Sequence, residues 1–427
     1  MQALPACEVL IIGGGPAGAT AAALLAGRGR DVVLLEKQRH PRFHIGESLL
    51  PLNLPLFAEL GVAAEIERIA MPKYGAEFVS PWHPQPITYN FADAWDKGFP
   101  YAYQVRRSEF DEILFRNAAR KGARTVEGCR ATAVELDAGG ATVSVQNDAG
   151  EQSWRARFLV DASGRDTFLA NRLEMKRRIR QHNSAAIFGH FSGAARASGK
   201  AEGNISIFWF DHGWLWLIPL AGGTSSVGAV CWPYYMKTRK TEPRQFLLDT
   251  IALCPALAER LANATLVSPV TATGNYSYVA KRSTGSNYLL LGDAFTFIDP
   301  VFSTGVYLAM HSAFVGADTI ERCLERPAEA RAALKAFDRS MRRGPRIFSW
   351  LIYRVTTPTL RDMFMDPSNR FRLQEAVLSL LAGDVFRGTP LRLRLAVFKL
   401  LYYAGNVMQP LRSWRAWTRR RQIIQSV

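Results

Sequence analysis

A glycine-rich turn between a short strand and a small-residue helix constrains the fold of this chain more than any other feature. Residues 7–12 are expected to form a buried strand, and Gly13-Gly14-Gly15-Pro16-Ala17-Gly18 fits the pattern G-x-G-x-x-G. A helix over 16–27 and a second strand over 31–35 follow, and Glu36 comes next. A strand, a crossover helix and a second strand are typical of a parallel sheet covered by helices. We therefore expect an α/β fold that opens with a nucleotide-binding unit.

The residue types at this turn suit a bound dinucleotide. Gly13 permits the tight turn, Gly15 lets the backbone approach a pyrophosphate, and Gly18 allows the helix to pack closely on the strand. The helix that starts at Pro16-Ala17 offers free N–H groups and the positive end of its dipole. Glu36 ends the second strand, where a carboxylate can accept hydrogen bonds from a ribose diol. Together these features predict a dinucleotide site.

Composition excludes several other classes of protein. The chain has 427 residues, 48% of them hydrophobic, so it can bury a large core. The five cysteines are scattered and the seven histidines include no H-E-x-x-H pair, so we predict neither a disulfide framework nor a metal site. No run of about 18 uncharged apolar residues occurs, and the N-terminus lacks the basic segment of a signal peptide. We expect a cytoplasmic protein.

Two later segments place an acidic residue and a glycine after an apolar strand. They are residues 158–164 (F-L-V-D-A-S-G) and 289–294 (L-L-L-G-D-A). Two further turns beside one nucleotide suit a long, extended cofactor. Over roughly residues 7–320 this pattern resembles the FAD-dependent monooxygenase and halogenase superfamily. The resemblance implies that Asp293 bonds the ribityl chain of FAD and that Arg107 lies near the FAD phosphates.

The order of the expected elements predicts a discontinuous architecture. With the resemblance, this order implies an FAD-binding Rossmann-like domain (GR2-type, PHBH-like) formed by residues 1–73, 104–184 and 286–343. Strand-like segments over 74–103 and 185–285 predict an inserted antiparallel β-sheet domain that binds the substrate. Residues 344–427 are expected to form a helical, basic C-terminal extension.

Four segments, in chain order, narrow the resemblance to the flavin-dependent halogenases. Residues 46–51 (G-E-S-L-L-P) resemble their flavin-contacting segment, which includes Ser48. Lys73, in K-Y-G-A, stands where these enzymes carry their catalytic lysine. Residues 213–219 (G-W-L-W-L-I-P) match their W-x-W-x-I-P signature. Residues 297–305 (F-I-D-P-V-F-S-T-G) match their F-x-x-P-x-x-S-x-G segment, which includes Pro300 at the flavin.

This resemblance implies a specific chemistry. Reduced FAD from a separate flavin reductase, O₂ and chloride or bromide would give hypohalous acid, and the sequence carries no second nucleotide motif for NAD(P)H. The halide would bind at Ser303, Thr304 and Gly305, because backbone N–H groups at a helix start hold an anion without a fixed cation. Gly305 would also let the backbone approach the isoalloxazine ring of FAD.

The resemblance also implies roles for side chains beyond the flavin. Lys73 would polarise or capture the hypohalous acid, and burial would lower its pKa. Trp214 and Trp216 would wall the passage between the flavin and this amine. Taken alone, such a lysine is usually solvated and such tryptophans are usually core, so these roles depend on the whole motif set. Asp299 either orders its loop or attaches the flavin covalently, and Glu47 either orients Lys73 or pairs with an arginine.

Positive charge is concentrated near the C-terminus. The net charge is +16, and after Asp384 the sequence has nine basic residues and no acidic ones. A packed helix with a solvated basic face would explain this pattern. Docking of an acidic carrier protein, or adhesion to an anionic membrane, would explain it equally. No nucleic-acid-binding fold accompanies the charge, so we do not expect nucleic acid as a partner.

The halogenase resemblance suggests an electron-rich aromatic substrate in secondary-metabolite or pigment biosynthesis. By analogy, the substrate would be a phenol or a pyrrole, either free or tethered to an acyl or peptidyl carrier protein. Two alternatives remain open at this point. One is another FAD-dependent oxidoreductase, either a hydroxylase or a geranylgeranyl-reductase-like enzyme. The other is a flavin-binding subunit that performs no chemistry.

Overall fold

The glycine turn lies at the carboxyl edge of a parallel sheet. The computed structural model describes residues 4–179, 183–274 and 277–425, and in it β1 (Ala6–Ile12) leads into α1 (Pro16–Gly27) and β2 (Val32–Glu36). β1 lies between β2 and β10 (Gly150–Asp161), and both are parallel to it. A Cβ atom at Gly18 would lie 1.9 Å from the carbonyl oxygen of Gly13, so the helix and strand can meet only at a glycine. The predicted β-α-β opening is confirmed.

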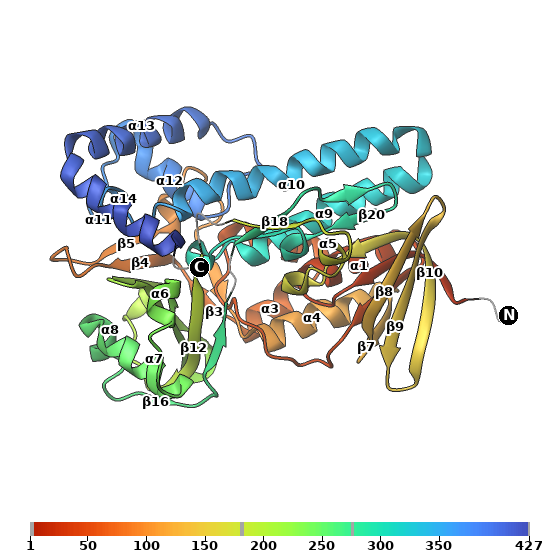
Figure 1. Cartoon of the computed structure of the whole chain (residues 1–427), viewed down its shortest axis with the longest axis horizontal. Coiled ribbons are helices and arrows are strands. Elements are labelled where there is room, and N and C mark those ends of the chain that lie inside the picture. Colours follow the sequence, from red (N-terminus) through yellow and green to blue (C-terminus); the bar gives the residue numbers. More distant parts are fainter. Residues whose placement is uncertain (1–3, 180–182, 275–276, 426–427) are drawn as a thin grey trace.

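The first sheet has the strand order β19-β20-β10-β1-β2-β7. Its core is parallel, and the hairpin of β8 and β9 pairs with the long strand β10 (Figure 1). Helices α4 and α9 pack against α1 beside this sheet. The elements not yet delimited are β7 (Arg124–Glu127), β8 (Arg130–Asp137), β9 (Gly140–Asn147), β19 (Thr284–Gly285), β20 (Tyr288–Leu290), α4 (Arg107–Arg120) and α9 (Gly305–Glu325).

The second sheet is inserted into the nucleotide unit and is mainly antiparallel. Its order is β16-β12-β15-β14-β13-β4-β5, with β17 also beside β12, and β4 runs parallel to β13. Two separate stretches of the chain supply these strands, which agrees with the predicted insertion. The strands are β4 (Gly75–Val79), β5 (Ile87–Asn90), β12 (Ala185–Ser192), β13 (Ile205–Phe210), β14 (Gly213–Pro219), β15 (Thr224–Cys231), β16 (Thr265–Leu266) and β17 (Thr271–Thr273).

The expectation of strands throughout residues 185–285 was wrong for residues 233–260. This stretch forms the helices α6 (Pro233–Met236), α7 (Pro243–Ala252) and α8 (Pro255–Arg260). Each helix begins with proline, whose fixed backbone angle suits the first helical position. Phe246 and Thr250, four residues apart, are both buried, so α7 turns one face to the second sheet.

Short elements connect the two sheets. β3 and β6 form a two-stranded ribbon, and β11, β18 and β21 form a three-stranded sheet. These elements carry several of the candidate site residues. The bounds are α2 (Leu54–Leu60), α3 (Ala63–Ile69), β3 (Met71–Lys73), β6 (Ala102–Gln104), α5 (Phe168–Arg172), β11 (Lys176–Arg178), β18 (Tyr278–Ala280) and β21 (Thr296–Phe297).

The C-terminal helices share a core with the second sheet. Phe348 and Phe364 belong to the same buried cluster as Phe78 and Trp209 of the sheet, and the helices lie along the top and left of Figure 1. α10 continues through residue 344, where we placed the start of the extension, so that proposed boundary falls inside a helix. The helices are α10 (Ala330–Ile352), α11 (Pro358–Met365), α12 (Leu373–Leu381), α13 (Arg392–Met408) and α14 (Pro410–Gln425).

Candidate active site

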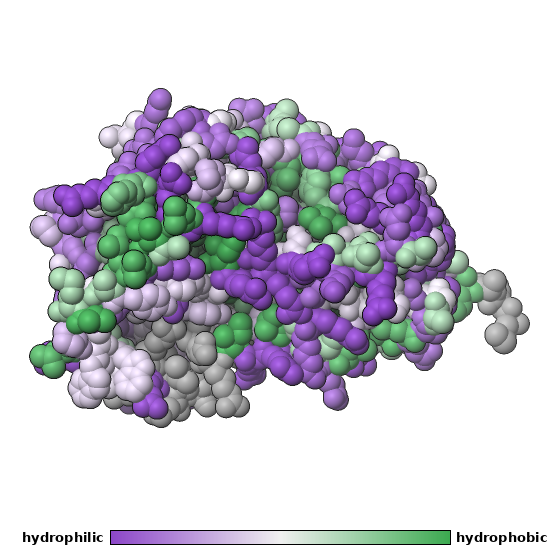
Figure 2. Space-filling view, turned by 90° about the horizontal axis from the view of Figure 1, so that it is seen from above, coloured by the Kyte–Doolittle hydropathy of each residue, from purple (hydrophilic) through white to green (hydrophobic). Residues whose placement is uncertain are grey.

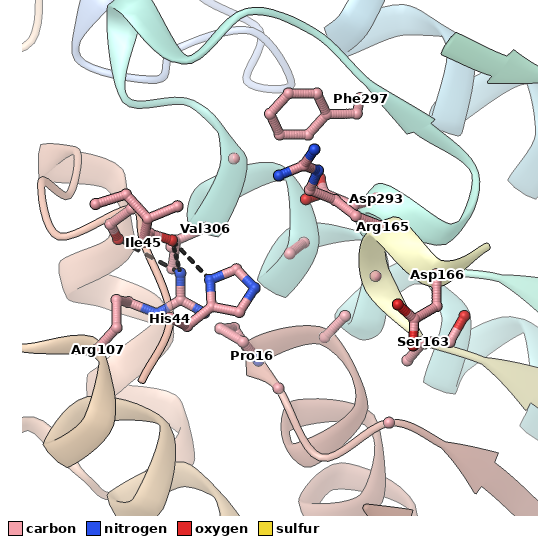
Figure 3. Close-up of a pocket in the computed structure, with 18 of the residues that line it drawn as sticks. Pro16, His44, Ile45, Arg107, Ser163, Arg165, Asp166, Asp293, Phe297 and Val306 are labelled. Carbon is pink, nitrogen blue, oxygen red and sulfur yellow. Dashed lines mark hydrogen bonds between the residues drawn. The ribbon is translucent and has the colours of Figure 1, made fainter. Parts of the chain in front are cut away.

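A cavity of about 610 Å³ lies at the carboxyl ends of the first sheet's parallel strands. This edge is where open parallel sheets bind their ligands. The cavity extends from Glu36, at the end of β2, to Gly305 at the start of α9, and strand β14 of the second sheet supplies part of its wall. Figure 3 shows side chains from these separate segments around the space. Its size is within the range of cofactor and substrate sites.

The glycine turn and Glu36 form the end of the cavity where the sequence predicts the ribose. Gly13, Gly15, Pro16 and Ala17 line it, whereas Gly18 packs against Gly13 and Ala162 behind it. The Glu36 carboxylate is buried and accepts a hydrogen bond of 2.8 Å from the backbone N–H of Gly14. Glu36 thus holds the turn in shape and also faces the cavity.

Arg107 lines the middle of the cavity, but its guanidinium is already engaged. It makes two hydrogen bonds with the Asp111 carboxylate, at 2.8 and 3.0 Å, and donates to the carbonyl oxygen of Ile45 at 3.0 Å. His44 stands beside it, and its Nδ1 atom donates to the same Ile45 oxygen, 2.7 Å away (Figure 3). Burial, aided by the Arg107 charge, lowers the pKa of His44 to about 4. Arg107 therefore fixes the loop that precedes residues 46–51.

Asp293 lies in the cavity wall opposite this loop. Burial raises the pKa of its carboxyl to about 6, against the opposing charges of Arg165 and Arg107. Figure 3 shows the Arg165 guanidinium between Asp293 and Phe297. Arg165 donates to the Thr273 hydroxyl at 2.6 Å and lies 5.4 Å from the centre of the Phe297 ring. Asp293 can therefore accept hydrogen bonds from a polyol near neutral pH.

The segment before α9 forms the far end of the cavity. Pro300, Ser303 and Gly305 line it, and a Cβ atom at Gly305 would meet no atom within 4 Å, so this face of the backbone is open. Thr304 instead lines a small adjoining cavity of about 50 Å³, which Gly305 also borders. Within the described chain, no hydrogen bond occupies the backbone N–H groups of Thr304 and Gly305. Such a helix start can bind an anion.

Trp214 and Trp216 lie two residues apart on β14 and therefore face the same side of the second sheet. Both line the cavity, and their ring centres are 5.8 Å apart. The Trp216 indole N–H donates to the Ser226 hydroxyl at 3.2 Å. Gly228 on β15 lies opposite Trp216, where a Cβ atom would come within 2.5 Å of the indole, so glycine makes room for this ring.

Lys73 is fully buried behind the cavity wall. It ends β3, where it pairs with Ala102 of β6. Its amine donates to the Ser48 hydroxyl at 2.9 Å and to the Leu49 carbonyl oxygen at 3.1 Å, and it lies 5.2 Å from the centre of the Phe91 ring. Burial lowers the pKa of the amine from 10.5 to about 7. Ser48 lines the cavity and Lys73 does not, so one hydroxyl group separates the amine from the cavity.

Within residues 4–179, 183–274 and 277–425, Glu47 bonds neither to Lys73 nor to an arginine. Its Oε1 atom lies 2.8 Å from Nε2 of His190 on β12, while its Oε2 atom is buried and has no partner among the described residues. Asp299, 1% exposed, accepts hydrogen bonds from the Val301 N–H at 3.1 Å and the Ser184 hydroxyl at 3.0 Å, and it is not part of the cavity lining. These contacts match the first alternative for Asp299, a carboxylate that orders its own loop.

Sequence reasoning missed several residues of the cavity wall. His44 and Arg165 line the cavity, and His190 lies behind Glu47; none of the three matches a motif. Arg165 and His190 meet their partners through contacts between segments far apart in the chain, whereas His44 bonds to the carbonyl oxygen of the next residue. The single local signal was Asp161, whose carboxylate accepts from the Ser163 and Leu169 N–H groups at 2.9 and 2.7 Å and so shapes the turn that carries Arg165.

The residues of this cavity suit FAD. The glycine turn, the acid at the end of β2 and the open backbone face at Gly305 are present on one continuous cavity. Comparison with known proteins agrees, because the FAD binding domain family matches residues 6–336. Among the described residues no group of three or more His, Cys, Asp or Glu side chains is placed to hold a metal ion.

Individual relatives narrow the family further. A flavin-dependent halogenase of Penicillium aethiopicum is 34% identical over 379 residues, which cover 81% of this chain and 70% of the relative. A 1H-pyrrole-2-carbonyl-(peptidyl-carrier protein) chlorinase of Pseudomonas fluorescens is 29% identical over 89% of this chain and 90% of its own length. The myxobacterial chondrochloren halogenase has a similar structure, with a TM-score of 0.79 and 33% identity over 90% of this chain and 92% of that one. The chain therefore belongs to the FAD-binding domain family and, within it, to the flavin-dependent halogenases.

Proposed function

We propose that this protein uses reduced FAD, O₂ and chloride or bromide to halogenate an electron-rich aromatic compound, with Lys73 directing the halogen. The observation that carries the proposal is the position of the Lys73 amine, which is buried one hydroxyl group away from the cavity that Trp214 and Trp216 line. When bound, reduced FAD would supply two electrons to O₂, and the oxygen reduced in this way would oxidise the halide.

The protein's own residues then control where the oxidised halogen goes. With a pKa of about 7, the Lys73 amine is present both charged and neutral near neutral pH. The charged form can donate a hydrogen bond to hypohalous acid, and the neutral form can accept the halogen. The open N–H groups at Thr304 and Gly305 suit the halide, and the tryptophans keep organic substrate away from the flavin.

The substrate class follows from the relatives. The Pseudomonas fluorescens relative acts on a pyrrole attached to a peptidyl carrier protein, and it matches nearly the whole of this chain. We therefore propose a pyrrole or phenol substrate, tethered to a carrier protein or free, and a separate flavin reductase as the source of reduced FAD.

Mass spectrometry of the product tests this function. The holoenzyme is incubated with a flavin reductase, NADH, O₂ and bromide, together with pyrrolyl- or phenol-loaded carrier protein or the free aromatic acids. We expect a brominated product, identified by the bromine isotope pattern, which disappears when halide is omitted. A hydroxylated or reduced product formed without halide would instead assign the protein to the hydroxylases or reductases. Flavin oxidation with no product from any of these substrates would leave it a flavin-binding subunit.

A further inference from the structure

The last two helices present an apolar face that no other part of the described chain covers. Among the residues whose side chains the structure describes, fifteen large hydrophobic side chains are exposed, and nine of them lie between residues 393 and 417. The exposure is therefore concentrated on the last two helices. Val407 is 78% exposed, Met408 81% and Leu411 76%. Figure 2 shows a hydrophobic patch on the side of the molecule where α13 lies, with hydrophilic residues around it. Patches of this kind mark interaction sites.

This face is separate from the one that anchors α13. Phe398 and Tyr402, both 7% exposed, pack into the core shared with the second sheet. Leu393, Leu400 and Val407 are spaced seven residues apart, about two turns each, and point away from that core. A surface helix usually turns polar residues to solvent, so α13 carries an additional apolar stripe that internal packing does not use.

Basic and aromatic side chains border the apolar stripe. Trp414 and Trp417 on α14 are 62% and 52% exposed, Arg415 is exposed, and Arg421 lies over the Trp417 ring at 4.4 Å. No acidic residue follows Asp384 in the chain. The like charge of two such faces opposes pairing of two copies of this chain through them.

We propose that α13 and α14 bind to the surface of an anionic lipid bilayer. Apolar side chains along two consecutive helices, tryptophans beside them and arginines at the border are typical of helices that lie in the headgroup region of a membrane. None of the helices in the described ranges is long and apolar enough to cross a bilayer, which fits binding at the surface. The arginines meet the anionic headgroups, and the leucine, valine and methionine side chains enter the acyl boundary.

Vesicle flotation tests this proposal without any requirement for halogenation. The holoenzyme is mixed with vesicles of phosphatidylcholine alone or of phosphatidylcholine with phosphatidylglycerol. The wild type should float with the anionic vesicles only. The variant Val407→Ser/Met408→Ser should bind them at least about tenfold more weakly, because two exposed apolar side chains no longer enter the bilayer. Leu253→Ser/Val267→Ser, which removes two exposed apolar side chains elsewhere, should bind like the wild type.

Three results would overturn the proposal. The first is a wild type that stays in the soluble fraction in both mixtures, and the second is a Val407/Met408 variant that binds as tightly as the wild type. The third is a wild type that binds no vesicles but binds an acidic acyl carrier protein, with that binding lost in the Val407/Met408 variant. This result would identify the face as a docking surface for a carrier protein. The FAD absorbance and melting temperature of each variant show whether it is folded.

A second, independent observation concerns the buried pair Glu47–His190. Glu47 lines the cavity with one carboxylate oxygen unpartnered, and its other oxygen bonds to His190. The His190 side chain keeps 11% of its surface exposed, compared with 2% for Glu47. The pair therefore spans the wall between the cavity and solvent.

We infer that Glu47 and His190 relay protons from solvent to the cavity, an inference that rests on the proposed function. Halogenation converts FADH₂, O₂, halide, the aromatic compound and one proton into FAD, the halogenated aromatic and two water molecules. A proton must therefore reach the cavity in every turnover. His190 would take it from solvent and Glu47 would pass it on through its free oxygen, so both are positioned for general acid–base work.

Histidine variants and nuclear magnetic resonance test the relay. His190→Gly should lower the turnover rate by about a hundredfold, and imidazole added to the buffer should restore part of it. His83→Gln is the matched control, because His83 also pairs with a carboxylate, that of Asp362 at 3.3 Å, but lies outside the cavity lining. This control should turn over like the wild type.

The apoprotein gives a second measurement that does not depend on activity. Nitrogen chemical shifts of labelled histidines should show His190 bonded through Nε2 in the wild type and lose that signature in Glu47→Gln. Wild-type turnover in His190→Gly, or a loss of turnover that imidazole does not relieve, would overturn the relay. If the wild type halogenates none of the substrates, the proposed function fails. The histidine spectra would still show whether Glu47 and His190 are hydrogen-bonded.

Discussion

At the scale of single residues, burial determines the chemistry of this site. Lys73 has hydrogen-bond acceptors but no carboxylate partner in the described part of the chain, so the loss of hydration dominates its pKa. Sequence comparison could identify Lys73 as a candidate, but its contact with Ser48 depends on the pairing of β6 with both β3 and residue 48. Such pairing joins distant segments and leaves no local sequence signal. The same reason explains why the Glu47–His190 pair was not predicted.

Burial of Lys73 predicts a pH-dependent cost in stability. The folded-state pKa of about 7 lies below the unfolded value of 10.5, so between these pH values the unfolded chain holds a proton that the folded chain releases. The free energy of unfolding therefore rises with pH through this window. Below about pH 7 the amine is protonated in both states, so the cost of burying its charge is at its full value and no longer changes with pH. Lys73→Met should be more stable than the wild type below this window, by up to about 5 kcal/mol, and the difference should shrink toward its upper end.

Urea unfolding of the apoproteins at several pH values measures this difference. Lys335→Met, on the surface side of α10, is the control and should show no such trend, since Lys335 is exposed. A constant difference between Lys73→Met and wild type across the whole range would contradict a depressed lysine pKa.

At the scale of elements, the segments that end at the start of α9 show that sequence patterns predict local parts of the site well. The glycine turn, the W-x-W-x-I-P strand and the segment up to Gly305 are local, and the structure brings their residues to one cavity. The pattern also predicts Thr304 in the lining of the main cavity, whereas in the structure Thr304 lines the small adjoining cavity. That detail depends on the left-handed backbone at Ser303, with φ of 56°, which nothing in the sequence required.

Gly305→Ala should separate folding from cofactor binding. The added methyl group meets no atom in the apoprotein, and alanine favours a helix over glycine by roughly 0.5–1 kcal/mol. The apoprotein should therefore be as stable as the wild type or slightly more so, while its affinity for FAD should fall at least about tenfold. Thermal unfolding and FAD titration measure the two effects. Unchanged FAD affinity would show that the cofactor does not approach this residue.

At the scale of the whole molecule, the C-terminal helices belong to the architecture. The cavity lining comes from residues 12–309, yet α11 to α13 complete the core of the second sheet. Tyr89 of β5 donates to the Phe364 carbonyl oxygen at 2.7 Å, and Arg361 lies 3.6 Å from the centre of the Trp82 ring. Basic composition alone could not distinguish these anchoring residues from the exposed ones, because both kinds alternate along the same helices.

Phe398→Ala should lower the stability of the protein without changing its affinity for FAD. Phe398 is buried in the shared core, so its truncation should lower the free energy of unfolding by about 3 kcal/mol. Leu400→Ala, two residues away and 67% exposed, should change it by less than about 0.5 kcal/mol. Denaturant unfolding and FAD titration of both variants provide the measurement. Equal effects of the two substitutions would mean that α13 does not pack as described.

In the proposed reaction, oxidised halide reaches the aromatic compound through Lys73. The most direct measurement is halogenated product formed per reduced FAD consumed, compared between wild type and Lys73→Met, with bound FAD confirmed by absorbance in both. We predict that Lys73→Met consumes reduced FAD and O₂ in the presence of bromide but yields no brominated aromatic product. Equal bromination by the two proteins would show that the halogen does not pass through Lys73.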